Sequence, residues 1–310
     1  MIDKLKPEPA HEPQPQNVVG GSRNDRCPIT IFTIPKSFEG HFGLIQRNAI
    51  RSWIELGLNV VVLGDDPGVA ESAEELGARH FGGIAVNEQG TPLIGDAFRM
   101  AHDVCETPVI AYCNADVILL QDFLDSVSQV MASNLGQKFL MIGRRTHLNV
   151  EREIDFQNSA DVQRLSAEAD SSGQLGPVVC KEYFIFNREL FQEVPNFAVG
   201  RWNWDSWMVA DAKANLIPVI DVTNGLTAIH QHHDYSHASA NRMSCYVSGD
   251  EARENQRLAG GRNLVNGSTA DWKLTADGHV SPCRMRWLRL GFWRDLPRFS
   301  KLLFNLIRSR

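Results

Sequence analysis

Continuous apolar runs in the first half of the chain predict a buried parallel sheet. The run ITIFTI at 29–34 consists of β-branched and aromatic residues without alternation, which is typical of a strand covered on both faces. Three further runs of this kind are NVVVLG (59–64), PVIAYC (108–113) and KFLMIG (138–143). The helical patterns between these runs cover residues 44–56, 69–76, 93–104 and 123–131. Strands that alternate with helices predict a mostly parallel α/β sheet between layers of helices.

The second half of the chain is less regular. Segment 145–180 is polar and rich in Asp, Ser, Gln and Gly, so we expect an inserted loop that is partly helical. Beyond it, the apolar pattern predicts strands at 183–186, 218–221 and 226–230, a helix over 204–216 and a polar helix around 250–259.

Both ends of the chain differ in composition from its middle. Residues 1–27 are rich in Pro, Glu and Gln, which predicts a disordered leader. Residues 284–310 interleave Arg with Trp, Phe and Leu and carry a net charge of +7, whereas the whole chain carries −6. This pattern predicts a tail that binds an anionic membrane surface. A tail that packs on the acidic body of its own chain, or that forms a dimer contact, explains the same pattern.

Composition excludes several classes of protein. The 310 residues are 43% hydrophobic, and the isoelectric point near 5.9 argues against a nucleic-acid-binding protein. No apolar run reaches the roughly 18 residues of a membrane-spanning helix, and the N-terminus lacks the apolar core of a secretory signal. The six cysteines form no C-x-x-C pair and are expected to be reduced thiols. We therefore predict a cytoplasmic protein, peripheral on the inner face of the membrane if the tail binds lipid.

Ligands of open α/β sheets bind beyond the carboxyl ends of the strands. In this chain those ends select residues 35–43, 64–66, 114–116 and 144–147. The sequence IPKSFEGHFG after the first strand matches neither the dinucleotide-binding nor the P-loop pattern of glycines. A phosphate group must therefore be held by a metal or by side chains.

Asn114-x-Asp116 is the first candidate, because it directly follows a buried strand. Its carboxylate and amide oxygens suit Mg²⁺ or Mn²⁺, which bridge a diphosphate. Capping of the next helix explains the same two residues.

The second candidate is the segment 200–213, in which three tryptophans surround Asp205. Aromatic rings pack on the apolar faces of sugars, and a partly buried Asp can act as a general base. The alternative is that the tryptophans belong to the core and that Asp205 caps a helix.

The third candidate is AIHQHHDYSH, with four histidines in eight positions. We predict that His230 shares a cation with Asp116, and that His232, His233 and His237 line the phosphate or acceptor side. The sequence does not supply the Cys or carboxylate ligands that would complete a closed zinc site here. A solvated polar loop explains at least two of the four histidines.

Two lesser candidates are Asp65 and Asp96. Asp65 ends the second strand and could hold a nucleoside, although turn formation explains it equally well. Asp96 lies near the start of its helix, where it could face the base or interact favourably with the helix dipole.

Taken together, these motifs resemble the GT-A glycosyltransferases, the nucleotide-diphospho-sugar transferase superfamily, over residues 29–237. The phrases IPKSFEGHFGLIQRNAIRSW, NADVILLQDFL and TAIHQHHDYSH carry a closer likeness to family-2-like glycosyltransferases. The resemblance implies a GT-A-like Rossmann-type sheet sandwiched by helices. It also implies a single catalytic domain over 28–265, preceded by the leader 1–27 and followed by the extension 266–310 with its basic amphipathic tail.

The resemblance also implies roles for single residues. Asp116 and His230 would bind a divalent cation, Mn²⁺ or Mg²⁺, and Asn114 stands at the first acid of the D-x-D metal motif. Asp205 would be the base that deprotonates the acceptor hydroxyl. The nucleotide-sugar would bind at Thr33, Asp65, Asp96, Asn114 and Asp116. The acceptor would bind at Arg201, Trp204 and His233.

The function implied by the resemblance is a glycosyltransferase of the hexosyltransferase type. It would move a sugar from a nucleotide-diphospho-sugar to a hydroxyl of a glycan or of a lipid-linked acceptor, with inversion favoured. Two alternatives remain open. One is a catalytically inactive module that binds a sugar nucleotide or a glycan, and the other is a sugar-phosphate nucleotidyltransferase, although IPKSFEGHFG lacks the Gly-rich signature of that class.

Overall fold

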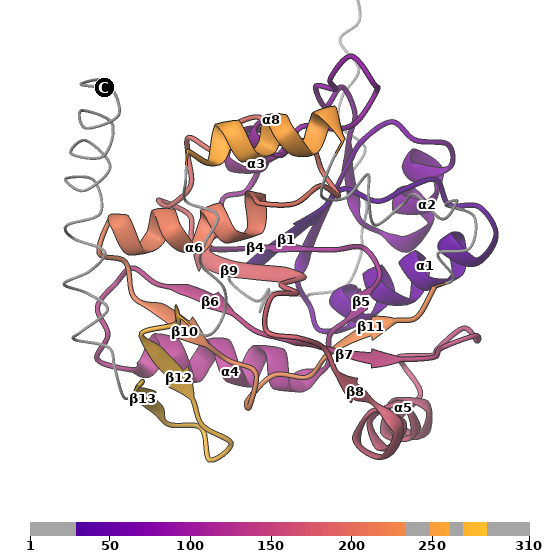
Figure 1. Ribbon diagram of the computed structural model, residues 1–310. Coiled ribbons are helices and arrows are strands. Elements are labelled where there is room, and N and C mark those ends of the chain that lie inside the picture. The colour runs from indigo at the N-terminus through magenta and orange to yellow at the C-terminus, as the bar shows by residue number, and fades with distance from the viewer. Residues whose placement is uncertain (1–28, 234–248, 261–268, 284–310) are drawn as a thin grey trace, which may run out of the picture.

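The computed structural model describes residues 29–233, 249–260 and 269–283. In these ranges a nine-stranded sheet forms the centre of the molecule, with helices on both faces (Figure 1). Five of the eight strand pairings in this sheet are parallel, so the mostly parallel α/β sheet predicted from the sequence is confirmed. From edge to edge its strands are β13 (Val280–Pro282), β12 (Trp272–Leu274), β10 (Val219–Asp221), β6 (Leu140–Ile142), β9 (Tyr183–Asn187), β4 (Val109–Cys113), β1 (Ile29–Thr33), β2 (Asn59–Leu63) and β3 (Arg79–Phe81).

Two hydrophobic cores cover the two faces of this sheet. Residues of the central strands alternate between the cores, so that Ile31 belongs to one and Phe32 to the other. Because both faces of the central strands are buried, these strands form nearly continuous apolar runs in the sequence. One core is completed by α1 (Gly40–Glu55), α2 (Val69–Leu76) and α4 (Gln121–Ala132), and the other by α3 (Ile94–Val104), α6 (Trp204–Ala214) and α8 (Asp250–Ala259).

Strand β9 runs against its neighbours. The sequence predicts a strand at 183–186, and the structure places it antiparallel to both β4 and β6. Tyr183 at its start therefore pairs with Cys113 at the end of β4. Because of this reversal, the residues that precede β9 lie beside the residues that follow β4, at the edge of the sheet where ligands are expected.

A smaller four-stranded sheet lies beside the carboxyl ends of the central strands. Its order is β5 (Val117–Ile118), β11 (Ala228–Gln231), β7 (Arg145–Leu148) and β8 (Gln174–Leu175). Helix α5 (Ser159–Ser172) packs on β7, and a third apolar cluster fills the space between them. The polar segment 145–180 was expected to be a partly helical insertion. It contains two strands of this sheet, β7 and β8, and the helix α5 that packs on it.

Some strands were missed by the sequence analysis, and some of its predictions concern residues that the structure does not describe. Strands β3, β12 and β13 were not predicted, because each has only three residues and no continuous apolar run. The short strands β5, β7 and β8 of the smaller sheet were not predicted as strands either. The leader 1–27, the basic tail 284–310 and His237 lie outside the described residues. Among the helices that the structure describes, none has both the length and the apolar composition needed to cross a membrane.

Candidate functional site

Three side chains converge where the two sheets meet. Asp116 lies in the turn between β4 and β5, His230 lies on β11, and His233 follows that strand. The antiparallel pairing of β5 with β11 places His230 opposite Val117, next to Asp116. Nε2 of His230 is 3.4 Å and Nε2 of His233 is 3.2 Å from the same oxygen, Oδ2 of Asp116. We call these three residues the Asp116 cluster.

The backbone beneath the cluster is held by Gln231, whose side chain is fully buried. The backbone N–H of Gln231 donates to the carbonyl oxygen of Asp116 at 3.1 Å, and its side-chain amide donates to the same oxygen at 3.2 Å. The Gln231 side-chain oxygen accepts a hydrogen bond from Asn48 of α1 at 3.0 Å. The turn that carries Asp116 is therefore tied to both β11 and α1.

The two imidazoles of the cluster are buried, and its carboxylate is ionised. His230 is 2% exposed and His233 5%. Burial alone would raise the pKa of the Asp116 carboxyl, but the hydrogen bonds and charges of the two imidazoles outweigh burial and hold that pKa well below its usual range. The carboxylate is thus charged at neutral pH.

The donor atoms of the cluster fit a divalent cation. One atom from each of the three side chains lies within 4.8 Å of the other two. In addition, Oδ1 of Asp116 and Nδ1 of His230 are buried without a hydrogen-bond partner among the described residues. Buried polar atoms without partners are costly and rare in native proteins. A carboxylate and two imidazoles are a common ligand set for a transition-metal ion.

The side chain and the backbone N–H of Asn114 are hydrogen-bonded to Tyr112 and Glu182. Its side-chain oxygen accepts a hydrogen bond from the hydroxyl of Tyr112 at 2.9 Å, and its side-chain nitrogen donates to Glu182. Its backbone N–H donates to the carbonyl oxygen of Glu182 at 2.9 Å. Both halves of the amide are therefore engaged next to the Asp116 cluster.

Glu182 is a site residue that sequence reasoning missed. It precedes β9, is buried, and pairs with Arg145 of β7. Burial raises the pKa of the Glu182 carboxyl, while the Arg145 guanidinium opposes the increase. The signal in the sequence is the pair Lys181-Glu182 directly before a buried apolar strand, where charged residues need partners.

His147 brings a third imidazole next to the cluster. Parallel pairing of β7 with β11 sets it opposite His230, and the two ring centroids are 5.0 Å apart. Its Nε2 accepts a hydrogen bond from Arg145 at 3.1 Å, and an arginine only donates, so this nitrogen carries no proton. Burial, aided by the charge of Arg145, lowers the pKa of His147 to about 4.

Asp205 lies in the first turn of α6 with both carboxylate oxygens engaged. Oδ2 is 3.0 Å from the ammonium group of Lys181, whose side chain is 1% exposed. Oδ1 accepts the backbone N–H of Ser206 at 2.8 Å. The residue at the N-cap is Asn203, not Asp205.

The tryptophans around Asp205 divide between core and surface. Trp204 and Trp207 are 7% and 6% exposed and belong to the core under α6, and Trp204 packs edge-on against Tyr112 at 5.2 Å. Trp202 is 44% exposed. Arg201 forms an ion pair with Glu251 of α8 at 2.5 Å.

The three remaining predicted residues lie on neighbouring strand ends and α3. Thr33 ends β1 and is fully buried, and its hydroxyl has no hydrogen-bond partner among the described residues. Asp65 follows β2 and accepts the backbone N–H of Gly83 at 2.7 Å. Asp96 accepts the backbone N–H of Ala85 at 2.8 Å and pairs with Arg99 at 2.5 Å. Within the described residues, none of the three forms a hydrogen bond or an ion pair with the Asp116 cluster.

No protein-family model matches the chain, and no curated protein is similar to it at a significant level. Among solved structures it is similar to glucosyl-3-phosphoglycerate synthase from Mycobacterium tuberculosis in complex with Mn²⁺, uridine diphosphate and phosphoglyceric acid. The identity is 14%, the TM-score is 0.43, and the match covers 76% of this chain and 78% of that one.

A mannosyltransferase from Pyrobaculum calidifontis in complex with GDP-Man and Mn²⁺ is similar at 14% identity and a TM-score of 0.45, over 76% of this chain and 65% of that one. A mycobacterial protein is similar at 15% identity and a TM-score of 0.47, over 82% of this chain and 83% of that one. These likenesses concern the fold, and the function is inferred below from the side chains of this chain.

Proposed function

We propose that the protein is a glycosyltransferase that moves a sugar from a nucleotide-diphospho-sugar to an acceptor hydroxyl with the help of a divalent cation. The observation that carries the proposal is the Asp116 cluster, in which a charged carboxylate and two buried imidazoles converge beyond the end of β4. This edge of an α/β sheet is where ligands bind. The finer assignments, which are hexosyl transfer, inversion and a glycan or lipid-linked acceptor, belong to the same proposal.

The cation would be held by Asp116, His230 and His233. When bound, it supplies Lewis-acid stabilisation of the negative charge that develops on the departing nucleoside diphosphate. Two imidazole ligands favour Mn²⁺ over Mg²⁺, which prefers oxygen ligands. The locked amide of Asn114 and the Glu182–Arg145 pair keep the turn before Asp116 in place.

Asp205 is the proposed base, and Lys181 sets the condition under which it can act. In the structure the carboxylate is ion-paired with the Lys181 ammonium. To accept the proton of an acceptor hydroxyl, Asp205 must release one of its two carboxylate oxygens, which Lys181 and Ser206 now engage. Arg201 and Trp204 are the proposed acceptor-binding residues, whereas His233, which the sequence analysis assigned to the acceptor, is proposed here as a cation ligand. Since Trp204 is 7% exposed, it would contribute only an edge to that surface.

A binding module without catalytic activity is the second candidate. The observation in its favour is that both oxygens of Asp205 are engaged by protein donors. Such a module would use the Asp116 cluster to bind a sugar nucleotide without transferring the sugar.

Calorimetric titration tests the proposal. UDP, GDP, CMP and dTDP would each be titrated with and without Mn²⁺ into the wild-type chain and into Asp116→Ala. We expect one nucleotide to bind only with Mn²⁺ and to lose its binding in the variant. Asp103→Ala is the matched control, because Asp103 is an exposed carboxylate on α3 whose partner among the described residues is Arg99.

The outcomes separate the candidates. Failure of all four nucleotides to bind in the presence of Mn²⁺ would contradict a nucleotide-sugar site. If one nucleotide binds, Asp205→Asn distinguishes the two functions. A transferase that uses Asp205 as its base loses donor turnover and keeps donor affinity, whereas a binding module has no turnover to lose.

A further inference from the structure

A second feature beside the Asp116 cluster is a cavity of about 490 Å³ between the small sheet and α5. Its volume falls in the range of about 300–1,000 Å³ that is usual for ligand pockets. The lining comes from β7, from the segment that follows it, from the end of α5, from β8 and from the residue after β11. The lining side chains that offer neutral hydrogen-bonding groups are His147, Asn149, Ser172, Gln174 and His232.

The cavity adjoins the proposed cation site through two of these residues. His147 contacts His230 of the Asp116 cluster, with ring centroids 5.0 Å apart. His232 lies directly before His233, and its backbone N–H donates to Leu148 of β7 at 2.9 Å. A molecule in the cavity would therefore lie next to the site where the proposed cation would bind the diphosphate of the donor.

The charged side chains of the lining compensate each other. They are Arg152 and Glu168, which form an ion pair at 2.8 Å. Glu168 also pairs with Arg164 of its own helix at 3.0 Å. The cavity thus presents no arginine without a carboxylate partner to a phosphate or carboxylate group.

Two lining side chains have unused hydrogen-bonding capacity. Gln174 and His232 are exposed, and within the part of the chain that the structure describes their side chains form no hydrogen bond with the protein, so both can bond to a ligand in place of water. An amide offers two donors and one acceptor, and an imidazole offers one of each when neutral. Adjacent donors and acceptors on a surface without net charge complement hydroxyl groups, each of which both donates and accepts.

We propose that this cavity is a second part of the acceptor site, in addition to Arg201 and Trp204, and that its ligand is a neutral polyhydroxylated molecule, such as a glycan residue, and not a phosphorylated or carboxylated one. This proposal deepens the proposed function and rests on it. Gln174 and His232 would hydrogen-bond the hydroxyl groups of the acceptor, and His147 would lie between the acceptor and the Asp116 cluster.

Saturation-transfer NMR on the full chain tests the proposal without relying on activity. The probes are the methyl glycosides of glucose, galactose, mannose and N-acetylglucosamine, compared with glucose 6-phosphate. We expect at least one neutral glycoside to bind and to bind about 5-fold more weakly in Gln174→Ala, the effect of one hydrogen bond. Glucose 6-phosphate is expected to bind more weakly than the neutral glycosides.

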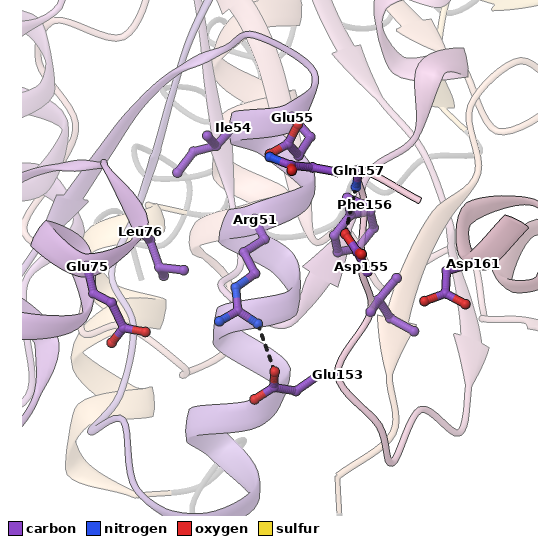
Figure 2. Close-up of a pocket in the computed structure, with 11 residues that line it drawn as sticks. Arg51, Ile54, Glu55, Glu75, Leu76, Glu153, Asp155, Phe156, Gln157 and Asp161 are labelled. Atoms are coloured by element: carbon purple, nitrogen blue, oxygen red, sulfur yellow. Dashed lines mark hydrogen bonds and ion pairs between the residues drawn. The ribbon is translucent and has the colours of Figure 1, made fainter. Parts of the chain in front are cut away.

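The matched control is Gln157→Ala. Gln157 lines a cavity of about 460 Å³ between α1 and the segment before α5, where carboxylates predominate (Figure 2). In that cavity Gln157 donates to Glu55 at 3.0 Å. Its replacement should leave binding of the glycosides unchanged, because the two cavities share no lining residue.

Three results would overturn the proposal: no neutral glycoside binds, Gln174→Ala binds as wild type does, or glucose 6-phosphate binds more tightly than the glycosides. Failure of the proposed function is recognised separately, by titration of Mn²⁺ and the nucleotides. If glycosides bind in a Gln174-dependent manner but no nucleotide binds, the cavity is a glycan-binding site and the proposed transferase function fails. If a nucleotide binds with Mn²⁺ and no glycoside does, only the subsite fails.

Discussion

The Asp116 cluster and the start of α6 around Asp205 both place an aspartate among aromatic or imidazole rings, but only the first leaves a carboxylate oxygen of its aspartate without a partner among the described residues. At the cluster, two imidazoles approach one oxygen of Asp116, and the other oxygen is buried without a hydrogen-bond partner among the described residues. At α6, the two oxygens of Asp205 meet Lys181 and Ser206. The first arrangement can gain stability from a ligand, whereas the second is already complete.

This difference separates an arrangement that is open to a ligand from one that is held by protein donors. A buried charge is tolerated when it is paired, and breaking such a pair is costly. Converging groups of which some remain unpaired are costly to fold and persist where a ligand completes them. We therefore expect changes at α6 to affect stability first, and changes at the cluster to affect metal binding first.

The largest effect is expected at Lys181. Lys181→Met leaves the Asp205 carboxylate without its cation in a mostly buried position and should lower the free energy of unfolding by about 3 kcal/mol. Urea denaturation measures the loss. Lys138→Met is the control, since Lys138 and Glu189 form an exposed pair, and it should change stability by less than about 0.5 kcal/mol. Equal effects of the two variants would mean that the Lys181–Asp205 pair is not structural.

The next effect concerns His233, the third member of the cluster. His233→Gln removes one ligand and should weaken Mn²⁺ binding by at least about 100-fold, because even partners of the ligands contribute about 10–100-fold. Calorimetric titration of Mn²⁺ measures the affinity. His279→Gln is the control, because His279 is 80% exposed on a surface turn beside Asp277. Wild-type Mn²⁺ affinity in His233→Gln would leave only Asp116 and His230 as ligands.

A smaller effect is expected from a change of metal. Two imidazoles and one carboxylate should bind Mn²⁺ at least about 10-fold more tightly than Mg²⁺. His233→Asp supplies a second carboxylate and should lower the ratio of Mn²⁺ affinity to Mg²⁺ affinity. Competition titrations of the two ions measure both ratios. A wild-type preference for Mg²⁺ would contradict the assignment of the imidazoles as ligands.

The smallest effect is expected at Tyr112. Tyr112→Phe removes the hydrogen bond to Asn114 and should lower the free energy of unfolding by about 1 kcal/mol. Tyr183→Phe is the matched control, because the Tyr183 hydroxyl is equally buried but has no hydrogen-bond partner among the described residues. Thermal unfolding of the two variants measures the difference. A loss at Tyr183 as large as that at Tyr112 would show that burial, not the bond to Asn114, sets the effect.

Local pattern alone was enough to predict most of the helices and the central strands of this protein. Helix α2 has the predicted bounds, 69–76, and the strands β1, β2, β4 and β6 lie within the predicted apolar runs. Hydrophobic periodicity is a property of neighbouring residues, and burial on both faces of a sheet leaves it visible in the sequence. The polar residues Asp116 and His230 were also predicted to share a cation, since each lies at or just after the end of an apolar run.

Only the tertiary structure decided which polar groups meet. The reversal of β9 brings Glu182 to Asn114 and Lys181 to Asp205, and nothing in the strand YFIF itself reveals its direction. The parallel pairing of β7 with β11 sets His147 beside His230, although 83 residues separate them. Direction and register depend on packing between distant segments, so the partner of each buried charge follows from the fold and not from its neighbours in sequence.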